Sequence, residues 1–292
     1  MLLASLVLAV TMATSSSPEL AELFRSANEA EFSGRQLSIT FADEGTVTDI
    51  RHVAQSHGMA MAETDKGATM AGFGVLYDDD KTAMASPDSV QMAFSDRYEV
   101  SIEATDRGIE ATIHEGEPIR ARFVFDAVSG ALEMTEVFSD GELFRLQMFI
   151  PDPELTAMPP MDDMAEPDMM VEVASPRLPA LEGYQSGAEF EADPGGVHRF
   201  YTDGLFRFSV FAFPGETSIT GMDSVYDARY SGRDGYYRSY GPSMTTVTWQ
   251  SSEEMFIVTG NLPPDHLANV VSQLPRPEEK NWLARMWSRL FG

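Results

Sequence analysis

Short runs of alternating apolar and polar residues dominate the chain and predict antiparallel β-structure. In the first half the runs cover residues 37–41, 47–51, 98–103, 109–114, 119–125, 132–138 and 144–148. Turns containing Gly or Asp separate many of these runs, at intervals of about 8–12 residues, which is typical of a meander. The pattern therefore predicts a curved antiparallel sheet that closes only partly into a barrel, and not a parallel α/β sheet.

One amphipathic helix precedes these strands. Ser17, Pro18 and Glu19 form a helix start, and apolar residues follow at helical spacing. A sheet that curves beside this helix has an apolar concave face, which is either filled core or a cleft for an apolar ligand. The residues predicted to line this cleft are Leu37, Ile39, Phe41, Phe123 and Phe125.

The second half contains the clearest hairpin signal, in residues 197–211. Asp203 and Gly204 stand at its centre and can both take positive φ, as a two-residue type I′ turn requires. Aromatic and β-branched residues alternate on both flanks. We expect Tyr201, Asp203, Gly204, Leu205 and Phe206 to organise this part of the chain, with partner contact near the turn.

Later patterns complete a smaller antiparallel sheet with one helix. Strands are predicted at 244–249 and 255–259, and a helix follows Pro263, with apolar residues at helical spacing up to Leu274. The fold class expected for the whole chain is mainly β with few helices (α+β). It combines a half-barrel domain at 18–150 with a smaller sheet domain at 179–275.

Composition narrows the functional classes. The 292 residues include 46 acidic and 20 basic side chains, which gives a formal net charge of −26. Such a surface repels phosphate backbones and so argues against nucleic acid as a partner, while it favours basic partners or simply reflects a general acidic bias. The chain has no cysteine, which excludes disulfides, thiolate metal sites and thiol nucleophiles.

Residues 1–17 resemble a signal peptide. The apolar run 2–10 is too short to span a bilayer, and small residues follow it before the polar segment 14–17. The run lacks the usual Lys or Arg ahead of it, so a buried apolar helix or a wrongly assigned start is the alternative. The signal-peptide interpretation predicts an exported, periplasmic or extracytoplasmic protein.

An acidic segment rich in Pro and Met, residues 151–178, is expected to link the two domains. Met158, Met161 and Met164 recur at every third position, and thioethers at such spacing are soft ligands that can bind Cu(I). A plain linker explains the segment without a metal, because nothing else in the chain points to metal handling.

The last segment, residues 276–292, is predicted to be an amphipathic tail helix. Its apolar stripe includes Trp282 and Trp287, and Arg285 and Arg289 lie away from that stripe. Trp beside Arg suits a membrane interface or a partner groove, and packing on the protein's own core is the third interpretation.

No arrangement of residues indicates catalysis, a cofactor or a metal. The five histidines show no metal-ligand pairing at helical spacing, and Gly183–Gly187 places its serine one position too late for a nucleophile elbow. Asp78, Asp79 and Asp80 lack the further ligands of a calcium loop. The sequence therefore predicts a protein that acts by binding.

Three stretches resemble the MucB/RseB family of sigma-factor regulatory proteins. The first is the helix end 23–27 with Phe32-Ser33-Gly34 and the strand 37–41, and the second is 125–130 with the hairpin 132–144. The third is 178–184, followed by Tyr201-Thr202-Asp203-Gly204-Leu205 and Phe208-Ser209-Val210-Phe211. The resemblance covers about residues 18–275 and does not include the tail.

The resemblance implies a first domain like the lipoprotein carriers LolA and LolB, and a smaller second sheet domain. It further implies a non-enzymatic regulator outside the cytoplasmic membrane. Such a regulator binds the exposed part of a membrane-spanning anti-sigma factor in envelope-stress control, shields it from proteolysis, and senses a lipid-like ligand in its cleft. A lipid or lipoprotein carrier, in which the cleft is the whole function, is the alternative, and a hydrolase is a third.

Overall fold

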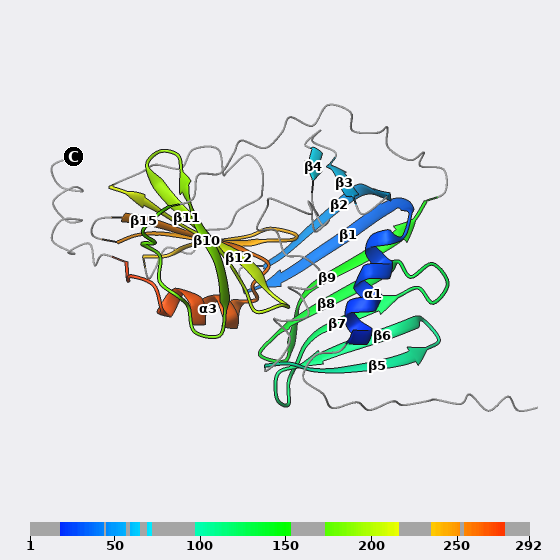
Figure 1. Ribbon diagram of the computed structural model, residues 1–292. Coiled ribbons are helices and arrows are strands. Elements are labelled where there is room, and N and C mark those ends of the chain that lie inside the picture. The colour runs from blue at the N-terminus through cyan, green and yellow to red at the C-terminus, as the bar shows by residue number, and fades with distance from the viewer. Residues whose placement is uncertain are drawn as a thin grey trace, which may run out of the picture. The chain divides into compact units, whose positions relative to one another are not determined.

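Two antiparallel sheets and two helices make up the described chain, and neither sheet closes into a barrel (Figure 1). The computed structural model describes residues 18–43, 45–56, 59–64, 69–71, 97–152, 173–215, 235–251 and 254–277. The prediction of a mainly β fold, with an open half-barrel and a smaller sheet, is confirmed.

The chain divides into two compact units. Unit 1 comprises Met1–Met169 and two short segments from later in the chain, Thr202–Phe206 and Pro263–Asp265. Unit 2 comprises Met170–Tyr201, Arg207–Leu262 and His266–Gly292. Each of them is built around one of the two sheets.

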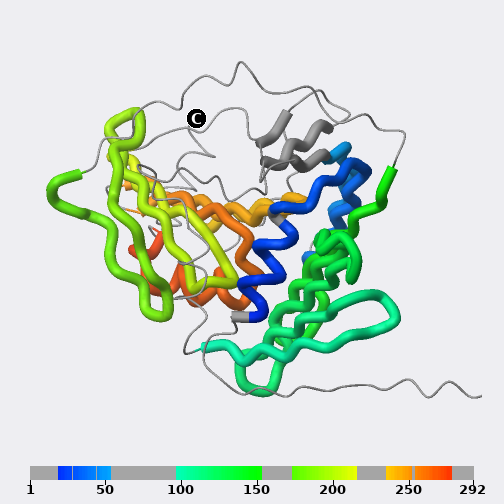
Figure 2. The backbone as a smooth tube through the Cα atoms, turned by 45° about the vertical axis from the view of Figure 1, so that its right-hand side comes forward, coloured from blue at the N-terminus to red at the C-terminus, as the bar shows by residue number. Residues whose placement is uncertain are grey.

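Unit 1 holds a nine-stranded sheet in the order β4-β3-β2-β1-β9-β8-β7-β6-β5. Its strands are β1 (Phe32–Ala42), β2 (Gly45–Ser56), β3 (Met59–Thr64), β4 (Thr69–Ala71), β5 (Glu99–Thr105), β6 (Gly108–His114), β7 (Ile119–Phe125), β8 (Leu132–Ser139) and β9 (Glu142–Pro151). All pairings are antiparallel, so the order is two meanders joined where β1 lies beside β9. Figure 2 follows this path, from the blue first strands to the green strands of the same sheet.

Helix α1 (Pro18–Glu29) covers one face of this sheet. The Phe24 ring meets the rings of Phe123 and Phe125 edge-on, at centroid distances of 5.0 and 5.5 Å. Leu20 and Ala27 on the same helix are buried. Aromatic pairs in this geometry add to the gain from burying their area, so these contacts position α1 on β7.

The strand ends explain the first stretch of the family resemblance. Phe32 packs on Phe149 of β9, with ring centroids 4.5 Å apart. Gly34 comes two residues later, where a Cβ atom would approach the Ile150 carbonyl oxygen to 2.4 Å and the Phe149 ring to 2.7 Å. The aromatic-x-Gly step therefore lies where a side chain on β1 would collide with β9.

The second stretch forms the turn between β7 and β8. The Asp126 carboxylate accepts hydrogen bonds from the backbone N–H groups of Val128 and Ser129, at 3.1 and 2.6 Å, and from the Ser129 hydroxyl. These bonds lower the pKa of Asp126, because the charged carboxylate is the better acceptor.

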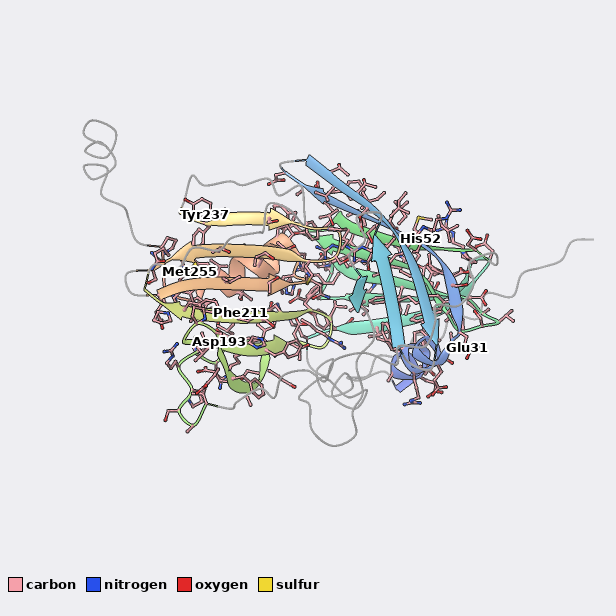
Figure 3. The ribbon with its side chains drawn as sticks, turned by 90° about the horizontal axis from the view of Figure 1, so that it is seen from above. Glu31, His52, Asp193, Phe211, Tyr237 and Met255 are labelled. Carbon is pink, nitrogen blue, oxygen red and sulfur yellow. The ribbon has the colours of Figure 1, made fainter. Side chains whose placement is uncertain are left out.

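Unit 2 holds a six-stranded antiparallel sheet in the order β10-β11-β12-β15-β14-β13. Its strands are β10 (Gln185–Ala192), β11 (Gly196–Thr202), β12 (Arg207–Pro214), β13 (Tyr237–Tyr240), β14 (Thr245–Gln250) and β15 (Glu254–Gly260), and α3 (Pro264–Ser272) follows. Figure 3 labels Phe211, Met255 and Tyr237 on β12, β15 and β13, and Asp193 in the turn after β10.

The core of unit 2 is aromatic. The Trp249 ring stacks on Phe256 at 5.3 Å and donates its indole N–H to the carbonyl oxygen of Pro275, at 2.7 Å. Tyr184 meets the Phe208 ring edge-on at 4.9 Å, and its hydroxyl bonds Nδ1 of the buried His266 on α3, at 3.0 Å. These contacts place α3 on the face of the sheet that carries Phe208.

Candidate functional site

The turn after β11 differs from the predicted two-residue type I′ turn at Asp203 and Gly204. Strand β11 ends at Thr202 and β12 begins at Arg207, and the Asp203 N–H donates to the Phe206 carbonyl oxygen at 3.2 Å. Gly204 has φ +92°, while Asp203 is not among the described residues with positive φ. The prediction of a type I′ turn here was wrong, because the central pair is Gly204 and Leu205.

Asp203 caps this turn with its side chain. Its Oδ1 accepts hydrogen bonds from the N–H groups of Leu205 and Phe206, at 3.1 and 2.7 Å, and only 4% of the residue is exposed. The Thr202 hydroxyl accepts from the Gly204 N–H and donates to the Phe206 carbonyl oxygen. The sequence Thr-Asp-Gly-Leu-Phe is thus a self-bonded turn.

Within unit 1, the other Asp203 oxygen belongs to a polar cluster. Tyr98 donates its hydroxyl to Oδ2 of Asp203 at 2.7 Å, and Arg97 lies 3.8 Å from the same oxygen. Burial raises the pKa of Tyr98, and the charge of Asp203 raises it further. Glu115 pairs with both Arg97 and Arg120.

The third stretch of the family resemblance, residues 178–184, is hydrogen-bonded to side chains of the unit 2 sheet, and we call it the strap. Glu189 is almost fully buried, and its carboxylate accepts from the N–H groups of Arg177 and Leu178, both at 2.8 Å. The Tyr201 hydroxyl donates to the Pro179 carbonyl oxygen at 2.7 Å, and Arg199 donates to that of Leu178 at 2.9 Å. Two carbonyl groups and one N–H group of the strap, together with the N–H group of the preceding Arg177, are therefore satisfied by side chains of β10 and β11.

The five residues predicted to line one cleft lie on opposite faces of the nine-stranded sheet. Directly paired residues share a face, and the ladder links Phe123 through Thr135 and Gln147 to Ser38. Phe123 and Phe125 therefore share the α1 face with Ser38. Leu37, Ile39 and Phe41 alternate with Ser38 and point to the other face. A single cleft lined by all five does not form.

The α1 face is polar where it crosses β2, β1 and β9. Arg51 and Arg145 are both buried, with 4% and 2% exposed, and Arg145 bonds the Thr40 hydroxyl at 3.2 Å. Burial lowers the pKa of Arg145 to about 9. Ser38 is also buried, and its hydroxyl has no hydrogen-bond partner among the residues that the structure describes. The alternation pattern led us to place the apolar residues of β1 on the α1 face. The buried Arg51, Arg145 and Ser38 on that face were therefore not predicted from the sequence.

His198 and the buried His266 act in packing. His198 stacks on Phe211 at 4.4 Å and bonds the Ser209 hydroxyl at 2.9 Å, and burial lowers its pKa. The described residues hold no group of three His, Cys, Asp or Glu that could bind a metal ion. Their helices include none long and apolar enough to cross a membrane.

The remaining predicted sites lie outside the described residues. They comprise the membrane-contact residues Trp282, Arg285, Trp287 and Arg289, the signal peptide 1–17 and the methionines of the linker. The last linker residues are described, and Val173 donates its N–H to the Glu189 carbonyl oxygen at 2.8 Å. This end of the predicted linker therefore packs on β10.

Comparison with known proteins gives similarity at the level of solved structures. No family model matches the chain, and no curated protein matches it. The complex of MucA and MucB from Pseudomonas aeruginosa is similar over 89% of this chain and 99% of the other, with 17% identity and a TM-score of 0.48. MucB in complex with MucA(peri) and MucB alone are similar over 89% of this chain and 98% of theirs, at 17% identity and TM-scores of 0.46 and 0.44.

Proposed function

We propose that this chain is an exported, non-enzymatic regulator that binds the extracytoplasmic part of a membrane-spanning anti-sigma factor and controls its proteolysis. The observation that carries the proposal is the Thr202–Phe206 turn and its flanking strands, whose sequence resembles the MucB/RseB hairpin. Among the matching residues, Asp203 caps the turn and the Tyr201 hydroxyl bonds the strap at 178–184, so both have a structural role.

The two-sheet architecture supports the same proposal. The resemblance implies a large open sheet with a helix and a smaller sheet with a helix, and both are present. We propose domains at 18–150 and 179–275, a linker at 151–178 and a tail helix at 276–292, with residues 1–17 as the signal peptide that directs export to the periplasm. Sensing of a lipid-like ligand by the first domain remains part of the proposal.

The carrier alternative has less support than the regulator. A carrier needs one continuous apolar cleft, and the residues predicted to line it are divided between two faces. Buried Arg51 and Arg145 make part of the α1 face polar as well.

Capture from the native membrane tests the proposed function. The full chain, exported in its native host and cross-linked there, is purified, and the attached proteins and lipids are identified by mass spectrometry. The proposal expects a single-span protein whose cytoplasmic segment binds a sigma factor. Recovery of lipid alone, with no membrane-spanning regulator, would favour the carrier instead.

A further inference from the structure

The face of the nine-stranded sheet that points away from α1 carries exposed apolar side chains on three adjacent strands. Ile50 on β2 is 53% exposed, Ile150 and Met148 on β9 are 45% and 38% exposed, and Phe41 on β1 is 39% exposed. We call this apolar patch on β2, β1 and β9 the open face. The half-buried Leu37 and Ile39 join these exposed side chains into one patch, unlike the singly scattered apolar residues that are normal on a surface. Arg35, which forms an ion pair with Asp152, lies beside Ile150 at the margin of the patch.

The strand register shows that the open face is continuous. Ile50 pairs with Leu37, Leu37 with Met148, and Met148 with Met134 on β8. In the next row Ile39 pairs with Leu146. Side chains of directly paired residues are neighbours on one face, so these rows form a single apolar surface.

The same face becomes acidic on the strands beyond. The row from Ile50 continues from Met134 through Val124, which is buried, to Glu110 on β6 and Glu103 on the edge strand β5. Glu99 on β5 shares the face and is exposed, like Glu103.

Arg122 on β7 lies among these acids. Arg122 pairs with Glu110 at 3.0 Å and with Glu136 at 2.6 Å, so its charge is shared between two carboxylates. The acidic side of the face therefore keeps a net negative charge that can attract a basic group.

We propose that this face binds an amphipathic helix of a protein partner, with apolar side chains over the open face and Lys or Arg over the acids of β5 and β6. Met148 and Glu110 are separated by three interstrand spacings, a distance of roughly 14 Å, and a helix of about ten residues spans that distance. The proposal rests on the proposed function, because the partner is the extracytoplasmic segment of the same membrane-spanning regulator.

Charge selects this occupant over two others. A membrane surface rich in anionic lipid would be repelled by Glu99 and Glu103 and by a chain of net charge −26. A second copy would bring the same acidic strands to the interface and meet the same repulsion. A basic amphipathic segment has apolar side chains for the open face and positive charges for the acids of β5 and β6. The opposite charges also speed its association with the face.

Binding of the captured regulator's extracytoplasmic segment to the full chain tests the inference. Ile50→Asp should weaken binding at least about tenfold. Glu103→Lys should weaken it about threefold at low salt and less at high salt. The matched controls are Val128→Asp, which is 96% exposed in a turn, and Glu191→Lys on β10, which is also exposed. Both controls should bind as the unmodified chain does, and circular dichroism should be alike for all five proteins.

The outcomes separate the inference from the proposed function. Tight binding that Ile50→Asp and Glu103→Lys leave unchanged overturns the docking face, while the proposed function stands. If the unmodified chain does not bind the segment, both fail. Flotation with phosphatidylglycerol vesicles or self-association in ultracentrifugation, abolished by Ile50→Asp, would assign the face to a membrane or a second copy and would also overturn the inference.

Discussion

Replacing Asp203 by Ala should loosen the hairpin turn from which the proposed function is argued. Oδ1 of Asp203 accepts from the N–H groups of Leu205 and Phe206, and Oδ2 accepts from the Tyr98 hydroxyl at 2.7 Å. The variant leaves three donors without this acceptor at a position that is only 4% exposed. Asp203→Asn retains one acceptor oxygen and separates loss of charge from loss of the cap.

The expected cost follows from these bonds. A hydrogen bond to a charged group contributes roughly 1.5–3 kcal/mol, and bonds to one carboxylate are not additive. We expect Asp203→Ala to lower the free energy of opening this turn by about 2–4 kcal/mol and Asp203→Asn by about 1 kcal/mol. A loss of about 2 kcal/mol speeds exchange roughly 30-fold when exchange follows opening.

Amide hydrogen exchange at Leu205 and Phe206 measures this effect at the turn, so it does not require the two-unit chain to unfold in one step. Asp106→Ala is the control, because Asp106 is exposed in another turn. It should change stability by less than about 0.5 kcal/mol. Unchanged exchange of both amides in Asp203→Ala would refute the capping role of Asp203.

Other changes test the packing and the titrating groups. Phe24→Ala should lower the free energy of unfolding of unit 1 by about 3 kcal/mol in calorimetry, because it removes two edge-on ring contacts. An unchanged melt would mean that α1 does not depend on these rings. Gly34→Ala should destabilise unit 1 in the same assay, since its Cβ would lie 2.4 Å from the Ile150 carbonyl oxygen, and a stable variant would contradict the close approach of β1 and β9. Since the pKa of Tyr98 is raised in the folded state, its contribution to stability is complete below pH 10. It is lost above that pH at up to about 1.4 kcal/mol per pH unit, as the unfolded tyrosine ionises. Above pH 10 the free energy of unfolding should fall less steeply with pH in Tyr98→Phe than in the unmodified chain. Equal slopes in the two proteins would count against burial of the hydroxyl. NMR titration should give His198 a pKa below its ordinary value of about 6.5, and a higher value would contradict its burial.

The pattern of alternation predicted most of the strands because side chains on one sheet face are buried and those on the other are more exposed. Strands β1, β2, β6 to β9, β11, β12 and β15 contain the residues predicted for them, and β5 and β14 begin one residue later than predicted. No run predicted β3, β4, β10 or β13, and α3 follows Pro263 as expected. The edge-on contacts of Phe24 depend on tertiary packing and could not be read from spacing.

Face assignment was the main failure. Leu37, Ile39 and Phe41 alternate as core residues do, yet they lie on the face opposite α1, while Ser38, Thr40 and Arg145 are buried on the α1 face. Alternation shows that a strand has two different faces, but it does not show which one is covered.

Two of the three Asp-Gly pairs in the chain show a second limit. Asp140 and Gly141 both take positive φ, at 49° and 82°, and join β8 to β9 as a two-residue turn. At Asp203 and Gly204 the same dipeptide forms a different turn, because the buried Asp203 carboxylate accepts the following N–H groups. Dipeptide identity cannot distinguish an exposed Asp from a buried one that caps the turn.

Pulse–chase labelling in the native host, with and without this chain, measures the half-life of the membrane-spanning regulator and so shows whether the chain protects it. The regulator should be degraded faster when the chain is absent, and restoring the exported chain should restore its lifetime. An identical half-life in both strains would contradict the claim that the chain binds this partner to control its proteolysis.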